Sequence, residues 1–310
     1  MRRKRALFLA VVSTVACGVL LGATLAIGWL AFGPEDDAGA AWLTVTKVGE
    51  SHYTSASPTQ PTFIAIIGND KRSGPDAGVS PGLGDALHVV GVNPVTKQAT
   101  ILNFPRDLEV EIPGVGSDKI NAAFAYGGLP LQVETLSNLI GVPISYAVTT
   151  NFDGFINLVN EAGGVDVNIP KDLNDTNSGA VFPAGPAHLN GDQALAFARD
   201  RYDFEQGDID RTGNQAYLMI SALAQLRTNY IGPSGTLRLL AILGRNTELQ
   251  GLGLREMYGL ARLALAIDPA AVGNVTPPIG NGSGSNLALG SGSDAIFADF
   301  RDDGVVGAVP

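Results

Sequence analysis

The chain has 310 residues, of which 45% are hydrophobic and only 16% are charged, so it is not intrinsically disordered and can bury one sizeable core. Its formal net charge is −10 at pH 7. Proteins that bind nucleic acids need an excess of basic side chains for phosphate contacts, so this composition argues against DNA or RNA as a partner.

The N-terminus combines a basic segment with a long apolar run. Residues 1–5 hold four basic side chains, and residues 6–32 contain no charged residue. A helix of this length spans a bilayer, and basic residues before it with acidic residues after it place 1–5 in the cytoplasm. We therefore predict a single-pass membrane anchor with an extracytoplasmic C-terminal part. A cleaved signal peptide is the alternative, although its apolar region is usually about 7–15 residues long.

The only cysteine, Cys17, lies inside this apolar run, so the exported part has no disulfide. We expect its thiol to be buried in the spanning helix, and a lipid-modified Cys17 is the other interpretation. Residues 33–60 are small, polar and weakly patterned, which predicts an extracytoplasmic stalk. A single domain is expected over 61–305.

The first strands of this domain are predicted by continuous apolar runs. Residues 62–67 indicate a strand buried on both faces. Residues 86–92 and 99–104 predict two more strands, and residues 93–97 between them have the length and composition of a hairpin turn.

Helical and strand patterns then alternate along the chain. Strands are expected at 144–149 and 165–169, and helical periodicity occurs at 131–140, 152–162, 192–199, 212–228 and 253–267. This interleaving favours a layered α/β or mixed α+β domain. The Gly- and Ser-rich tract 280–293 is predicted to be a flexible surface loop.

The three histidines, His52, His88 and His188, are not accompanied by a nucleophile motif, so Ser-His-Asp hydrolysis is a poor fit. No His or Cys cluster has the spacing of zinc ligands either. His88 lies within a predicted strand, where we expect a partly exposed strand residue rather than a catalytic base.

Arginines and aspartates gather in four groups that border predicted strands and turns, at 68–72, 84–85, 105–107 and 199–211. Ligands of layered α/β domains bind where strands end, so three of these groups are expected to meet at one rim. Guanidinium groups bind phosphate oxygens and carboxylates hold Mg²⁺, a combination that suits a diphosphate and phosphoryl transfer. The alternative is a set of ordinary surface ion pairs, each of which contributes little.

Ten short motifs, spread over about residues 62–228, resemble the LytR-CpsA-Psr family in order and spacing. They are Gly68-Asn69-Asp70-x-Arg72, Gly84-Asp85, Asn103-Phe104-Pro105-Arg106-Asp107, Ile112-Pro113-Gly114, Asp118-Lys119-Ile120-Asn121-Ala122-Ala123, Gly127-Gly128, Gly163-Gly164-Val165-Asp166, Leu189-x-Gly191-x-Gln193-Ala194-Leu195, Arg199-x-Arg201-Tyr202 and Gly207-Asp208-x-x-Arg211-Thr212.

This resemblance implies an α-β-α layered domain with a mixed central sheet and an apolar pocket for a polyprenyl tail. Members transfer a glycopolymer from a polyprenyl diphosphate carrier to peptidoglycan, typically to the 6-hydroxyl of N-acetylmuramic acid, and leave a phosphodiester link. A polyprenyl-diphosphate pyrophosphatase side activity is also expected. Residues that line the pocket would be apolar, but each candidate could equally belong to the core: Phe124, Leu136, Ile156 and Leu195.

By position, the resemblance assigns roles to nine side chains. Asp70 and Asp85 would be the Mg²⁺-associated carboxylates. The diphosphate would be bound by Arg106, Arg199, Arg201 and Arg211, with Gln215 beside them. The catalytic group would comprise Arg106, Asp107, Asp208 and Arg211, in which the two aspartates orient the arginines. Lys119 and Asn121 match the lysine-containing segment of the family, and either a structural or a catalytic role is open for them.

The sequence departs from the family pattern at two places. Leu83 stands where the family usually has an arginine, and Gly213-Asn214 replace two more arginines. Two hypotheses follow. The chain is a Mg²⁺-dependent transferase with a reduced set of cations, or it is a non-catalytic module that binds wall polymers or partner enzymes.

Overall fold

A computed structural model describes residues 43–49, 59–69, 82–230 and 247–307, together with 232, 234–237 and 239. The predicted anchor at 6–32 and residues 70–81, including Asp70, lie outside these residues. Within the described part of the chain, no helix is long and apolar enough to cross a membrane.

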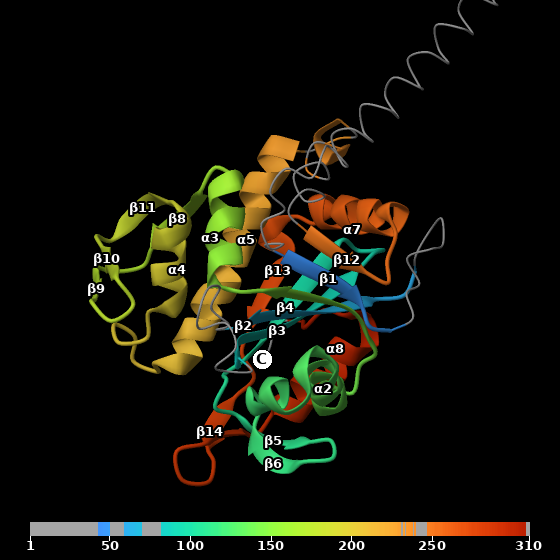
Figure 1. Cartoon of the computed structure of the whole chain (residues 1–310), viewed down its shortest axis with the longest axis vertical. Helices are drawn as coiled ribbons and strands as arrows, with labels where there is room; N and C mark the ends of the chain where they lie inside the picture. The colour runs from blue at the N-terminus through green and yellow to red at the C-terminus, as the bar shows by residue number, and fades with distance from the viewer. Residues whose placement is uncertain are drawn as a thin grey trace, which may run out of the picture.

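A mixed seven-stranded sheet forms the centre of the molecule, in the order β12-β1-β7-β2-β3-β4-β13 (Figure 1). The pairs β1–β7, β2–β3 and β3–β4 are antiparallel, whereas β1–β12, β2–β7 and β4–β13 are parallel. The strands are β1 (Leu43–Lys47), β2 (Thr62–Asn69), β3 (Gly84–Asn93), β4 (Gln98–Phe104), β7 (Ile144–Thr150), β12 (Thr247–Gln250) and β13 (Val272–Val275).

Helices and four two-stranded sheets surround this sheet. The helices are α2 (Ala122–Ile140), α3 (Phe152–Glu161), α4 (Gly191–Arg199), α5 (Asp208–Tyr230), α7 (Leu254–Ala266), the 3₁₀ turn η2 (Pro269–Ala271) and α8 (Ser293–Asp303). The small sheets pair β5 (Glu109–Ile112) with β6 (Gly116–Lys119), β8 (Val165–Ile169) with β11 (Gly185–Leu189), β9 (Leu173–Asp175) with β10 (Ala180–Phe182), and β14 (Ile279–Asn281) with β15 (Leu287–Leu289).

The two faces of the central sheet have different environments because side chains alternate along each strand. Phe63 and Ile67 point into the main core with helices α2 and α8, and the Phe63 ring lies 5.3 Å from that of Phe300. Ile66 and His88, which are partners in the β2–β3 register, face the opposite side and line a cavity beside α5. The α-β-α layering implied by the family resemblance is therefore present.

The predicted strands, the hairpin turn and the predicted helices are confirmed. The turn between β3 and β4 is held by Asn93, whose side-chain oxygen accepts hydrogen bonds from the N–H groups of Val95 and Thr96, each at 3.0 Å. Helix α4 begins with a capping box formed by Asn190 and Gln193, as its sequence favours.

Two predictions were wrong. Residues 43–47, assigned to the stalk of 33–60, form strand β1 and pair with β7 and β12, so the sheet begins before residue 61. The short Leu-Thr-Val-Thr-Lys alternation is typical of a strand but is easily missed beside polar neighbours. The tract 280–293 contributes to the β14–β15 hairpin instead of forming a loop throughout, and α8 begins at Ser293.

Candidate functional site

A cavity of about 900 Å³ lies between the central sheet and helices α3, α4 and α5. One part of its wall is charged and is formed by Asp85, Arg106, Arg199, Arg201 and Arg211. Another part is apolar and includes Phe155, Leu158, Val159, Leu218, Met219 and Leu226. The cavity is therefore amphipathic, with the charged wall near the ends of β2, β3 and β4.

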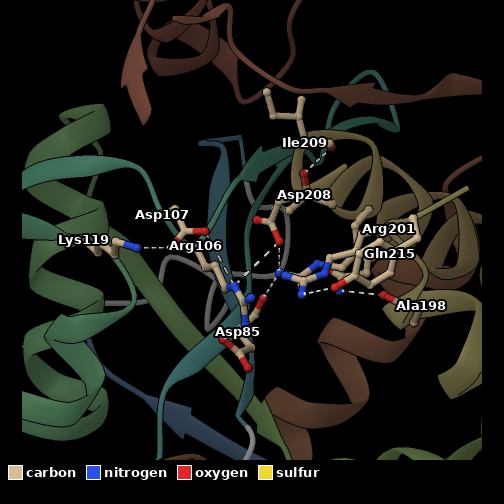
Figure 2. Close-up of polar contacts among 12 residues, drawn as sticks. Asp85, Arg106, Asp107, Lys119, Ala198, Arg201, Asp208, Ile209 and Gln215 are labelled. Carbon is tan, nitrogen blue, oxygen red and sulfur yellow. Dashed lines mark hydrogen bonds and ion pairs between the residues drawn. The ribbon is translucent and has the colours of Figure 1, made fainter. Parts of the chain in front are cut away.

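Arg106 contacts three carboxylates, of which Asp85 belongs to the charged wall (Figure 2). Its Nη1 donates a hydrogen bond to Asp85 Oδ1 at 3.0 Å, and its Nε lies 3.6 Å from Asp208 Oδ1 and 3.9 Å from Asp107 Oδ2. Burial opposes the charge on Arg106, but these three aspartates together hold its pKa above the ordinary value. Arg106 is a permanent cation on the cavity wall.

Arg211 is the most deeply buried cation of the site. Its Nη2 lies 2.7 Å from Asp208 Oδ1 and donates a hydrogen bond to the backbone carbonyl of Asp85 at 3.2 Å. Burial, together with the charge of Arg106, lowers its pKa despite the compensating effect of Asp208. Its Nε has no hydrogen-bond partner among the described residues, and such a donor suits an anionic ligand.

Helix α5 brings three of the predicted site residues together. Asp208, Arg211 and Gln215 are spaced by three and four residues, which places them on one face of a helix. Gln215 Nε2 donates to the backbone carbonyl of Ala198 at 3.0 Å, so its side chain connects α5 to the end of α4. Gln215 and Arg201 both line the cavity.

Arg199 and Arg201 line the cavity without an ion pair to any described carboxylate. Arg199 lies over the ring of Phe152, with 5.2 Å between the guanidinium carbon and the ring centroid. Arg201 lies over the ring of Tyr202 at 4.9 Å and donates to its hydroxyl at 3.0 Å. Aromatic rings orient these two guanidinium groups and leave their charge available to a ligand.

Asp200, between the two arginines in sequence, is fully buried and does not line the cavity. Its Oδ1 accepts a hydrogen bond from the N–H of Asp203 at 3.3 Å, whereas its Oδ2 has no partner among the described residues. Burial raises the pKa of the Asp200 carboxyl to about 6.

Asp107 and Lys119 pair with each other outside the cavity, and Asp107 contacts Arg106. Lys119 Nζ lies 2.6 Å from Asp107 Oδ1, and neither residue lines the cavity. The N–H of Asn121 donates to the backbone carbonyl of Arg106 at 3.4 Å. These contacts favour the structural role for the lysine-containing segment, because they fix the turn that carries Arg106 and reach no cavity atom.

Only part of the predicted metal site can be placed. Asp85 offers a half-buried carboxylate at the cavity, and Asp70 lies outside the described residues. No group of three or more His, Cys, Asp or Glu side chains able to hold a metal occurs in the described ranges. Mg²⁺ commonly takes one or two carboxylates and completes its shell with substrate phosphates and water, so Asp85 fits such an ion.

The apolar candidates named from sequence divide between core and cavity. Leu136 is fully buried in the main core, and Phe124 packs partly buried against it. Leu195 lines the cavity, and Ile156 does not. The sequence analysis did not name most of the residues of the apolar wall. The spacing of Leu218, Met219 and Leu226 on α5 nevertheless places them on one face of the helix.

His88 was also missed, and the expectation that it is partly exposed was wrong. Only 1% of its surface is exposed, and both ring nitrogens have partners: Nδ1 lies 2.9 Å from Asn103 Oδ1, and Nε2 lies 3.2 Å from Gln215 Oε1. Strand alternation places His88 with Ile66 on the cavity side of the sheet. Its link to Gln215 connects it to the predicted diphosphate site.

Known proteins similar to this chain share both its sequence and its architecture. The polyisoprenyl-teichoic acid–peptidoglycan teichoic acid transferase TagU of Bacillus anthracis is 40% identical over 175 residues, which are 56% of this chain and 54% of TagU. The match thus spans about half the length of that relative.

Solved structures extend the similarity of the fold. TagV of B. subtilis superposes with a TM-score of 0.65 at 24% identity and covers 79% of this chain and 97% of its own. YwtF (TagT) with bound octaprenyl pyrophosphate lipid gives a TM-score of 0.60 at 24% identity, with 79% and 91% covered. The sequence profile of the LytR_cpsA_psr family matches residues 40–274, more than half of the chain. The chain therefore belongs to the LytR_cpsA_psr family.

Proposed function

We propose that this protein transfers a glycopolymer of the teichoic-acid class from a polyprenyl diphosphate carrier to peptidoglycan, with Mg²⁺, at the outer face of the cell membrane. The similarity to TagU, a polyisoprenyl-teichoic acid–peptidoglycan teichoic acid transferase, supports polymer transfer as the reaction. The octaprenyl pyrophosphate bound by YwtF (TagT) supports a polyprenyl diphosphate as the carrier. The predicted anchor at 6–32 would hold the domain beside its lipid substrate.

The observation that carries this proposal is the amphipathic cavity. A lipid diphosphate has a doubly anionic head and a long apolar tail, and one cavity here joins four arginines to an apolar wall. Arginine binds phosphate oxygens with two parallel N–H groups, while the apolar wall removes the prenyl chain from water. A water-soluble nucleotide would leave that apolar wall uncovered.

The proposed reaction is a phosphoryl transfer in which negative charge develops on the phosphoryl oxygens and on the leaving phosphate. The acceptor hydroxyl attacks the phosphorus that bears the polymer, a new P–O bond forms, and the P–O bond to the lipid phosphate breaks as the hydroxyl proton leaves. Polyprenyl phosphate departs with the negative charge. Arg106 and Arg211 would stabilise the charge on the phosphoryl oxygens, while Asp208 and Asp107 hold them in place.

Asp85 would hold Mg²⁺ together with the diphosphate oxygens, and Asp70 is the second carboxylate in our proposal. The bound ion would neutralise part of the charge on the leaving phosphate. Asp85 also accepts a hydrogen bond from Arg106, so the metal and the guanidinium would share one carboxylate.

The proposal is tested by binding and turnover on the full-length protein. A prenyl diphosphate linked to N-acetylglucosamine should raise the melting temperature, because a ligand that binds only the native state stabilises it. At a ligand concentration of 100 times Kd the stabilisation is about 2.7 kcal/mol. The shift should be larger with Mg²⁺ than with EDTA. An unchanged melting temperature at saturating ligand, with and without Mg²⁺, would remove the basis for the site.

Leu83 favours a second candidate, a binding module that does not turn its ligand over. This residue is half-buried just before Asp85, where the family usually has an arginine. In a transferase, Leu83→Arg should add a charge-assisted hydrogen bond of about 1.5–3 kcal/mol, so that transfer rises or at least does not fall. In a binding module whose pocket is shaped around an apolar side chain, the same change buries an unpaired cation and lowers stability.

Melting temperature and polymer transfer should be measured side by side on the wild type and on Leu83→Arg. Destabilisation of the variant with no transfer by either protein would support the binding module over the transferase.

A further inference from the structure

A chain of hydrogen bonds runs through the buried His88 ring and ends on a backbone carbonyl at each side, with Asn274 at its exposed end. From His88 it passes through Gln215 to the carbonyl of Ala198, and in the other direction through Asn103 and Asn274 to a carbonyl on α5. Carbonyl oxygens only accept hydrogen bonds. The two ends therefore fix the orientation of every amide between them.

On the first side, the carbonyl of Ala198 requires the NH₂ group of Gln215, at 3.0 Å. The oxygen of the same amide then faces His88 Nε2 at 3.2 Å. Because an amide oxygen cannot donate, this contact is a hydrogen bond only when Nε2 carries a proton.

The second side leads to the same requirement. The carbonyl of Gly213 requires the NH₂ group of Asn274 at 3.0 Å, so Asn274 Oδ1 faces Asn103 Nδ2 at 2.7 Å. Asn103 Nδ2 also lies 3.2 Å from the hydroxyl of Thr276, and Asn103 Oδ1 faces His88 Nδ1 at 2.9 Å. Reversing either amide would set two oxygens or two NH₂ groups against each other. Nδ1 must donate as well, and only an imidazolium donates from both nitrogens.

The surroundings of the ring oppose this charge when no anion is bound. Burial, together with the charge of Arg211, lowers the pKa of His88 to about 4, although the contacts with Asn103 and Gln215 favour the charged form. The neighbouring strand β2 presents Ile66 at this register position, and α5 presents Arg211 and Gln215. No carboxylate pairs with the ring within the described ranges. A neutral ring leaves one of the two contacts with facing lone pairs.

An anion in the cavity reverses this balance. His88 and Gln215 line the same cavity as Arg106 and Arg211, where the proposed function places a diphosphate. Two phosphate charges in a partly buried site offset the repulsion from Arg211 and favour a nearby cation. The hydrogen-bond chain is already arranged to stabilise that cation.

We propose that His88 is the proton-binding positioning residue of this site: it takes up a proton when a lipid diphosphate fills the cavity and then donates both ring N–H groups, to Gln215 and Asn103. The charged ring fixes the Gln215 side chain against the site and adds one positive charge to it. This inference rests on the proposed function, and it adds a proton to the binding equilibrium.

The first experiment measures protons taken up on binding, by titration calorimetry of the full-length protein in two buffers that differ in ionisation enthalpy. The probe is a short prenyl diphosphate capped with N-acetylglucosamine, because neither phosphate of a diester titrates near neutral pH. At pH 6 we expect roughly half a proton or more per bound probe. Affinity should rise by up to about tenfold per pH unit as pH falls from the pKa of the complex toward 4.

Two other ionisable side chains provide the controls. Asp200 has a raised pKa, and the exposed His188 pairs with Asp166 at 2.7 Å. Uptake should persist in Asp200→Asn and in His188→Gln and disappear in His88→Met. Uptake that survives His88→Met, or binding without uptake in the wild type, overturns the assignment and leaves the proposed function intact. Failure of the probe to bind at all overturns both.

Imidazole ¹⁵N spectra of the wild type test the same proposal without a core substitution. One protonated ring nitrogen of His88 is expected in the free protein and two in the complex at pH 6, with the other histidines assigned from His188→Gln and His52→Gln. A ring that stays neutral in the complex would contradict the proposal.

Discussion

Replacing Arg106 by methionine is expected to lower the rate of polymer transfer by about 10²–10³-fold, the usual cost of removing one preorganised donor to a developing negative charge. Methionine keeps much of the volume of the arginine stem but supplies no N–H group. Arg106 contacts Asp85 at 3.0 Å on the cavity wall, so the loss also removes the neighbour that orients the proposed metal ligand. The probe should bind more weakly for the same reason.

Arg262→Met is a matched control, since Arg262 lies exposed on α7 and its guanidinium lies over the ring of Tyr258 at 5.9 Å. This variant should transfer polymer at the wild-type rate. Both variants are compared by single-turnover transfer and by thermal unfolding. If Arg106→Met loses activity only in proportion to its loss of folded protein, Arg106 is part of a structural ion-pair network and the proposed role is wrong.

The fold could be predicted where the pattern is local. The apolar runs of β2, β3 and β4 and the periodicity of α3, α4 and α5 each lie within one segment of sequence, and all were found. Strand β1 was missed because five residues of Leu-Thr-Val-Thr-Lys become a strand only through their partners β7 and β12. Tertiary pairing overrides such weak local preference.

Helix α2 shows a second kind of limit. Its periodicity predicts a helix only from residue 131, whereas the helix begins at Ala122. Gly127 and Gly128 have non-helical backbone angles within it, and Pro130 follows. These residues interrupt the sequence pattern at the point where the chain kinks, so the first part of the helix carries no helical signature of its own.

The candidate site could be predicted as a set of charges but not as a cavity. Spacing along α5 places Asp208, Arg211 and Gln215 on one face, and the strand ends bring Asp85 and Arg106 to them. The hydrogen-bond chain through His88 joins β3 to β4, β13 and α5, and no local pattern links those elements. A polar network of this kind is specified by the assembled fold.

Replacing Asp208 by asparagine is expected to destabilise the free protein by roughly 3–5 kcal/mol, the cost of removing one partner from a buried ion pair. Asp208 Oδ1 lies 2.7 Å from Arg211 Nη2 and 3.6 Å from Arg106 Nε, so its loss leaves two cations facing each other. The carboxylate also lies in the first turn of α5, where a negative charge is stabilised by the helix dipole.

The stabilisation by bound ligand should increase in Asp208→Asn, although the free variant is less stable than the wild type. A diphosphate supplies the negative charge that Asp208→Asn removes and no longer competes with Asp208 for Arg211, so the probe should stabilise the variant more than the wild type. Transfer should nevertheless fall, because the two guanidinium groups lose the carboxylate that orients them. Asp210→Asn is the matched control on the same turn, where Asp210 accepts from the N–H of Gln206 and pairs with no described arginine. Thermal unfolding with and without probe is measured together with transfer rates. If the probe raises the melting temperature equally in Asp208→Asn, Asp210→Asn and the wild type, Arg211 and Arg106 do not bind the diphosphate.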